Sequence, residues 1–341
     1  MAGTSGGRSS LFRPIAAAAL GAGIVALGGV SAAAIAGRRI RNRHDAALDA
    51  MAHRPADAIH HNLPTEDGGS VHVVEVGSGR PIVLLHGVTL QWWVWSPLIN
   101  VLKDRYRVLA WDMPGHGESE LGADGFTITS VTRDLAMVLD TLDCDGAVLV
   151  GHSLGGCVIG NFVALEPAAL AARVSGLAFV ASAANLSGNL LRHGSAKTFF
   201  GAFGGVLLLG LRKPNPNLSW SDNDLSAALI GQAFGPTATA DMVAATRQMT
   251  AEFPARTSVQ ASAVLAAHDA RSALASVTVP TAVIAGEYDK LLPPDHSREI
   301  ANLVPGARYT ELAGIGHQIM QEAPRELAAA LDDLVERVAA H

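Results

Sequence analysis

Continuous apolar runs, separated by stretches with helical spacing, dominate residues 66–340. A run that is apolar at every position suits a strand buried on both faces, as in a parallel sheet. Between two such runs, residues 128–142 carry apolar side chains three or four positions apart, which predicts an amphipathic helix. Strands alternating with helices predict an α/β fold, with a mostly parallel, doubly wound sheet and helices on both faces. The predicted strands lie at 71–76, 81–85, 106–111, 147–150, 176–180, 281–285 and 307–312.

The alternation of strands and helices stops after Ser182. Roughly ninety residues, about 185–275, have instead the pattern of helices and loops. Within them, residues 199–211 form an unusually apolar stretch that is too short to span a bilayer. This stretch predicts a buried helix, whose apolar face could also line an acyl pocket or touch a membrane.

Residues 1–44 contain a candidate membrane anchor at 15–37, a segment without any charged residue. At about 1.5 Å per residue, such a helix would cross a hydrocarbon core of roughly 30 Å. By the positive-inside rule, the arginines that follow it would leave the rest of the chain facing the cytoplasm. The alternative is a secreted protein with a cleaved signal peptide, in which Ala32, Ala33 and Ala34 resemble a cleavage site. The arginines are Arg38, Arg39, Arg41 and Arg43.

Residues 45–65 are polar and end before a glycine-rich turn, which indicates a linker in front of a domain at 66–341. The adjacent His60 and His61 belong to this linker and indicate no metal site. The formal net charge of −6, with acids and bases interspersed, offers no basic face for nucleic acid. No phosphate-binding loop is evident either, so the sequence predicts neither a cofactor nor a metal.

The motif Gly-His-Ser-Leu-Gly-Gly at 151–156 follows an apolar strand and precedes a helix. A serine in such a turn adopts a strained backbone conformation, and glycines two residues before and after it avoid a collision. This arrangement, the nucleophile elbow, lifts the Ser153 hydroxyl clear of the sheet. The pattern therefore predicts that Ser153 is a nucleophile.

Four further motifs accompany the elbow: LLHG at 84–87, DMPGHGES at 112–119, GEYD at 286–289 and GIGH at 314–317. In this order they resemble the α/β-hydrolase fold family, over about residues 66 to 340. The resemblance implies an eight-stranded, mostly parallel sheet and a helical cap inserted at about 185–275. It also implies an oxyanion hole formed by the backbone N–H groups of Val88 and Leu154.

A serine needs a histidine to take its proton and a carboxylate to orient that histidine. In this family the chain order is serine, acid, histidine, which selects His317 ahead of His296 and His341. The family's G-x-x-D turn selects Asp289 as the acid. Glu287 and Asp295 are the alternatives, and helix capping explains Asp295. Asp112 and His116 belong to a glycine-rich turn and are interpreted as structural.

Relatives that open epoxides or remove halogens use aspartate at the nucleophile position, whereas this chain has serine. The expected reaction is therefore hydrolysis of an ester or thioester of a small, largely apolar substrate through an acyl-enzyme. The apolar stretch at 199–211 favours acyl chains of about six to ten carbons. The alternatives are hydrolysis of a C–C bond or cofactor-free peracid formation with the same triad, and a membrane-tethered binding protein without turnover.

Overall fold

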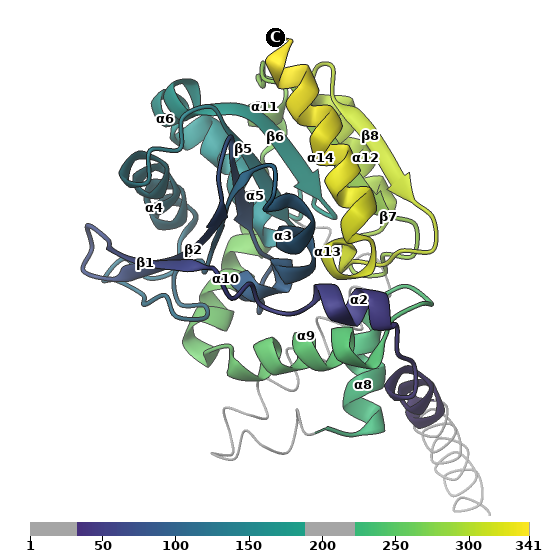
Figure 1. Cartoon of the computed structure of the whole chain (residues 1–341). Coiled ribbons are helices and arrows are strands. Elements are labelled where there is room, and N and C mark those ends of the chain that lie inside the picture. The colour runs from purple at the N-terminus through teal and green to yellow at the C-terminus, as the bar shows by residue number, and fades with distance from the viewer. Residues whose placement is uncertain (1–32, 188–221, 341) are drawn as a thin grey trace, which may run out of the picture.

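An eight-stranded sheet forms the centre of the molecule in the computed structural model, which describes residues 33–187 and 222–340 (Figure 1). The strand order is β1-β2-β4-β3-β5-β6-β7-β8, antiparallel at β1–β2 and β2–β4 and parallel at every other pairing. The predicted mostly parallel α/β sheet is therefore confirmed. The strands are β1 (Ile59–Pro64), β2 (Ser70–Gly77), β3 (Pro81–Leu85), β4 (Arg107–Trp111), β5 (Ala147–His152), β6 (Val174–Val180), β7 (Thr281–Gly286) and β8 (Arg308–Leu312).

Two hydrophobic cores cover the two faces of the sheet. Along β3, Val83 and Leu85 join one core with α4, α5, α11 and α12, and Ile82 and Leu84 join the other with α3, α13 and α14. This alternation arises because successive side chains of a strand point to opposite faces. The helices that pack against the two cores are α3 (Ser96–Leu102), α4 (Ile128–Thr141), α5 (Leu154–Leu165), α6 (Pro167–Arg173), α11 (Arg271–Leu274), α12 (Pro294–Leu303), α13 (Ile319–Glu322) and α14 (Pro324–Ala339).

The segment 45–65 is not a linker, contrary to the sequence-based expectation. It holds helix α2 (Ala46–Met51), which the Asp45 side chain caps, and the edge strand β1. Strand β1 pairs with β2 over its whole length, yet its residues are exposed or half-buried. An edge strand with little burial needs few apolar residues, which is why its sequence has the composition of a linker.

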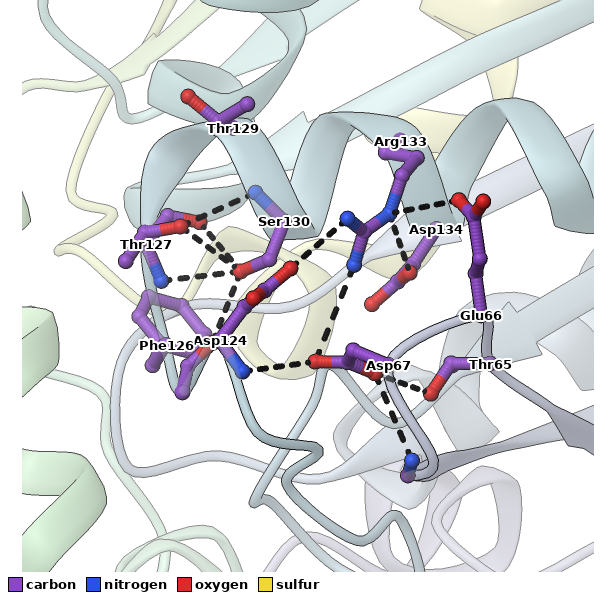
Figure 2. Close-up of polar contacts among 12 residues, drawn as sticks. Thr65, Glu66, Asp67, Asp124, Phe126, Thr127, Thr129, Ser130, Arg133 and Asp134 are labelled. Atoms are coloured by element: carbon purple, nitrogen blue, oxygen red, sulfur yellow. Dashed lines mark hydrogen bonds and ion pairs between the residues drawn. The ribbon is translucent and has the colours of Figure 1, made fainter.

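The turn between β1 and β2 is fastened to helix α4, as Figure 2 shows. Asp67 in this turn accepts hydrogen bonds from the Thr65 hydroxyl at 2.6 Å and the Asp124 N–H at 3.2 Å. Arg133 of α4 pairs with Asp124 at 2.8 Å and lies 3.8 Å from Asp67. The turn of the hairpin is thus held to helix α4, although β1 lies at the edge of the sheet.

Between β6 and β7 the structure describes helices α8 (Asp224–Ile230), α9 (Ala240–Glu252) and α10 (Ala255–Ala267), with a short 3-10 helix η3 (Gly231–Ala233). In Figure 1 these helices lie together beyond the carboxyl ends of β6 and β8, which the arrowheads mark. The apolar stretch 199–211 lies outside the described residues. We call α8, η3, α9 and α10 the cap helices.

Most of the predicted anchor at 15–37 lies outside the described residues, and only its end, from residue 33, belongs to a helix that is seen. Over residues 33–187 and 222–340, no single helix is long and apolar enough to cross a membrane. Helices α5 and α6, which meet at a sharp bend, are together long and apolar enough to do so by length and composition alone. Helix α5 is a core helix, buried behind the elbow.

Candidate active site

Ser153 occupies the turn between β5 and α5 with a φ of 52°. A side chain on Gly151 would place its Cβ 2.5 Å from the Gly156 nitrogen, and one on Gly155 would lie 2.2 Å from the Leu85 carbonyl oxygen. Both contacts are closer than real Cβ atoms approach, so each position requires glycine. The strained conformation of Ser153 is typical of a functional residue.

Asp289 and His317 lie in the loops that follow β7 and β8. Ser153 follows β5, so all three residues lie at the carboxyl ends of parallel strands. The His317 Nδ1 lies 2.7 Å from the Asp289 Oδ2, and both side chains are buried. The other carboxylate oxygen of Asp289 accepts N–H groups from Leu291 at 2.8 Å and Leu292 at 2.9 Å. Because a carboxylate only accepts, His317 carries its proton on Nδ1, and its Nε2 is available as a base.

The competing residues lie elsewhere. Glu287 accepts the Gly314 N–H at 2.8 Å, and Asp295 is exposed and pairs with Arg298. His296 is the third residue of α12, and His341 lies outside the described residues. Among the described carboxylates, Asp289 alone contacts the His317 ring.

Asp112 and His116 are also separate from the Ser153 site. Asp112 is fully buried and binds His72, and His116 stacks on Phe253 with ring centroids 4.5 Å apart. Neither side chain lines the cavity that contains Ser153. Their contacts fit the structural interpretation of the turn at 112–119.

Ser153 and His317 line one cavity between the sheet and the cap helices. Its volume is about 50 Å³. Thr246, Thr250 and Gln318 add polar groups to a wall that is otherwise mainly apolar. The apolar side chains include Leu90, Leu186, Ile230, Leu265 and Leu291.

The two predicted oxyanion donors flank this cavity. Val88 lines it directly, and Leu154 is the first residue of α5. Among the residues that the structure describes, neither backbone N–H has a hydrogen-bond acceptor. Thr89, the next residue after Val88, has a φ of 67°. Free amide groups beside a strained turn and at a helix N-terminus can stabilise a developing negative charge.

His152 is a residue of the site that the sequence analysis left without a role. Its Nε2–H donates to the His317 carbonyl oxygen at 3.0 Å, and its ring lies 4.7 Å from the His317 ring. Burial, and secondarily the His317 charge, hold the pKa of His152 well below its usual value. His152 therefore stays neutral and positions His317. Its place next to Ser153 in the motif was the available signal.

Glu322 is a second residue that the sequence analysis missed. Its carboxylate accepts the Gly316 N–H at 3.1 Å and the Gly235 N–H at 2.7 Å. Burial raises the pKa of this carboxyl to about 7, although the two amide bonds oppose the shift. One buried group thus joins the loop that carries His317 to the segment that follows η3.

The sequence model of the family described as alpha/beta hydrolase fold matches residues 80–324. The chain belongs to this family. It is 29% identical over 269 residues to a pimeloyl-[acyl-carrier protein] methyl ester esterase of Stenotrophomonas maltophilia (strain K279a), covering 78% of this chain and 96% of that protein. It is 24% identical to the AB hydrolase superfamily protein YisY of Bacillus subtilis (strain 168), covering 78% and 96%.

The fold of this α/β hydrolase also resembles solved esterase structures. An esterase from Exiguobacterium antarcticum superposes with a TM-score of 0.70 at 18% identity, covering 82% of this chain and 100% of that one. Such low identity supports the fold and not a particular substrate. The predicted family and hydrolase class are confirmed.

Proposed function

We propose that this α/β hydrolase cleaves carboxylic esters, or thioesters, of a small and largely apolar substrate through an acyl-enzyme on Ser153. The observation that carries the proposal is the buried Asp289–His317 pair, 2.7 Å apart, whose histidine lines the same cavity as the strained Ser153. The apolar wall of that cavity suits an acyl group. The similarity to a protein named as a methyl ester esterase supports an ester as the substrate class.

In the proposed reaction the Ser153 Oγ attacks the ester carbonyl carbon while the His317 Nε2 takes the serine proton. The carbonyl oxygen becomes an oxyanion, which the N–H groups of Val88 and Leu154 stabilise. The tetrahedral intermediate collapses, and the alcohol leaves with the proton from His317. Asp289 keeps the imidazole in the required tautomer and stabilises its protonated form.

The second half of the reaction regenerates the serine. Water, with its proton taken by the His317 Nε2, attacks the acyl carbonyl, and a second oxyanion forms at the same two amide groups. Its collapse releases the carboxylic acid and returns the proton to the Ser153 oxygen.

Covalent labelling with a fluorophosphonate probe tests this proposal, because the probe reacts with activated serines. We expect wild type to be labelled at Ser153, with release of ester product in parallel assays. Ser153→Ala should lose both. Ser262→Ala, on helix α10 and outside the cavity wall, is the matched control and should keep both. A folded wild type that neither reacts with the probe nor turns over esters would favour the binding-protein alternative.

A further inference from the structure

Three potential metal ligands meet at the edge of the sheet, outside the Ser153 cavity. His60 lies on β1, His72 lies on β2, and Glu118 belongs to the turn after β4. One ligand atom from each residue falls within 4.8 Å of the other two. His60 aligns with Val74 and His72 with Asn62, so the two histidines are diagonal neighbours on one face of the hairpin.

The two imidazoles face each other directly. The His60 Nδ1 lies 2.9 Å from the His72 Nε2, whereas the ring centroids are 5.1 Å apart, so these nitrogens project toward each other. The opposite nitrogen of His72, Nδ1, donates to the Asp112 Oδ2 at 2.9 Å. This bond fixes the proton of neutral His72 on Nδ1, so its Nε2 accepts a hydrogen bond from the His60 Nδ1–H.

Asp112 supports two of the three residues at once. Its Oδ2 also accepts the Glu118 backbone N–H at 3.1 Å, and its Oδ1 accepts the Trp92 N–H at 2.7 Å. A buried carboxylate that orients a histidine ligand through its second nitrogen is the usual support of a protein zinc site. Here the same carboxylate also places the backbone that carries Glu118.

The Glu118 carboxylate is exposed and has no hydrogen-bond or ion-pair partner within the described part of the chain. Two imidazole nitrogens and a carboxylate form a donor set that suits divalent transition metals, Zn²⁺ among them. We propose that His60, His72 and Glu118 bind one such ion, with water completing a tetrahedral site.

Metal binding replaces the hydrogen bond between the two histidines. Bonds of about 2.0–2.1 Å in a tetrahedral site place two ligand nitrogens about 3.3 Å apart. The present 2.9 Å separation must therefore open by a few tenths of an ångström. The His60 ring must also turn, so that its Nδ1 lone pair points at the ion and not at the His72 Nε2. His60 can make this movement because it is exposed on an edge strand. It must also carry its proton on Nε2, so that Nδ1 can bind the ion.

The ion would have a structural role. None of its three ligands lines the cavity of Ser153 and His317. It would tie β1 to β2 and to the turn at 112–119, in the middle part of the hairpin. Binding to the folded state alone would raise the stability of the protein without changing ester hydrolysis.

Cobalt spectroscopy with the full-length, tag-free protein tests the site, since four-coordinate Co²⁺ absorbs visible light far more strongly than six-coordinate Co²⁺. We expect wild type to develop this absorption with one equivalent of Co²⁺ and to lose it when Zn²⁺ is added. His60→Ala removes one exposed ligand, and Glu118→Gln replaces the other, also exposed, with a neutral amide. Each should weaken Zn²⁺ binding at least about tenfold and abolish the rise in Tm that Zn²⁺ gives wild type.

Two matched controls locate the site. His61→Ala removes the adjacent histidine, which contacts Glu75 at 2.9 Å instead. His44→Ala disrupts a second group of possible ligands, His44, Asp49 and Asp241. Both should bind Zn²⁺ like wild type, and all four variants should hydrolyse esters at the wild-type rate. Absence of the cobalt band in wild type, or its persistence in His60→Ala, would overturn the proposal, as would its loss in either control.

Discussion

Two buried aspartate–histidine pairs lie in different parts of this molecule with nearly the same geometry. In each, a histidine Nδ1 contacts an aspartate Oδ2, at 2.7 Å for His317 with Asp289 and 2.9 Å for His72 with Asp112. In each, the aspartate Oδ1 accepts backbone N–H groups. The contact between histidine and aspartate is therefore closely alike in the two pairs.

The two pairs differ in what surrounds the rest of the imidazole. The His317 ring lines an apolar cavity together with Ser153, whereas the His72 Nε2 faces another imidazole at the sheet edge. A buried aspartate is thus a general device for fixing a histidine tautomer, and the surroundings of the second nitrogen select the use. Proton transfer is proposed for one pair and metal binding for the other.

The largest expected effect separates the pairs by activity. Asp289→Asn should lower kcat for a p-nitrophenyl ester by about 10⁴-fold, because His317 loses its tautomer control and its compensating charge. Asp112→Asn should leave kcat within about tenfold of wild type and instead reduce the free energy of unfolding by about 2 kcal/mol, through weaker buried hydrogen bonds. Steady-state kinetics and urea denaturation of both variants measure these effects.

Equal losses of kcat in the two variants would contradict this separation. Circular dichroism at the assay temperature is the control, since an unfolded Asp112→Asn protein would also be inactive. Asp295→Asn supplies a further comparison. Its side chain is exposed and pairs with Arg298, so neither activity nor stability should change appreciably.

A smaller effect concerns Glu322, the buried carboxyl that supports the loop of His317 and has no counterpart described at the His72–Asp112 pair. Its pKa in the folded protein is about 7, against 4.5 for an ordinary glutamate, so the folded state holds the proton more tightly. Stability from this group is fully present below about pH 4.5 and is lost as the pH rises to about 7. The loss is about 3 kcal/mol at most.

Glu322→Gln should remove this component of the pH dependence. Urea denaturation between pH 5 and pH 8 should show that the free energy of unfolding falls more steeply in wild type than in the variant. Glu326→Gln, four residues later and exposed, is the matched control and should follow wild type. Parallel pH profiles for all three proteins would show that Glu322 ionises normally in the folded state.

The smallest effect tests the cavity that distinguishes the first pair. A cavity of about 50 Å³ among the described residues suits short acyl groups, of about two to four carbons. We therefore expect kcat/KM for p-nitrophenyl esters to be highest from acetate to butyrate. Leu265→Ala enlarges the cavity and should move the optimum to longer chains. For these longer esters, kcat/KM should rise by up to roughly threefold per added carbon.

Leu274→Ala is the control for that variant, because Leu274 is a buried core residue outside the wall. It should leave the chain-length profile unchanged. The sequence-based expectation of six to ten carbons depended on residues 199–211, which lie outside the described residues. A wild-type profile that rises through ten carbons would contradict the small cavity and favour a contribution from that stretch.

Most of the sheet could be predicted from sequence because strands β3, β5 and β7 are buried along their whole length. Burial on both faces demands an uninterrupted apolar run, which is a local signal. Strand β1 gave no such signal. It exists because it pairs with β2, a contact between residues about ten positions apart, and its exposed face tolerates polar residues.

The residues of the candidate site also fall into those with a local sequence signal and those without one. The elbow is visible in sequence because its backbone strain requires glycine, and family order supplied Asp289 and His317. Glu322 and the His60–His72 contact could not be predicted, since each depends on groups that only folding brings together. The available hint for Glu322 was an acid two residues after the apolar pair Ile319 and Met320, in a segment now seen to be buried.

The backbone bonds around His317 couple the entrance to the chemistry. The His317 N–H donates to the Ala233 carbonyl oxygen at 2.8 Å, and Glu322 holds Gly235 beside it. Any movement that lifts this part of the cap away from the sheet also removes supports of His317, the proposed general base. Opening by that route and bond cleavage are therefore mutually exclusive states. Substrate must enter while residues 233–235 stay in place, or the enzyme must reassemble its histidine loop in every catalytic cycle.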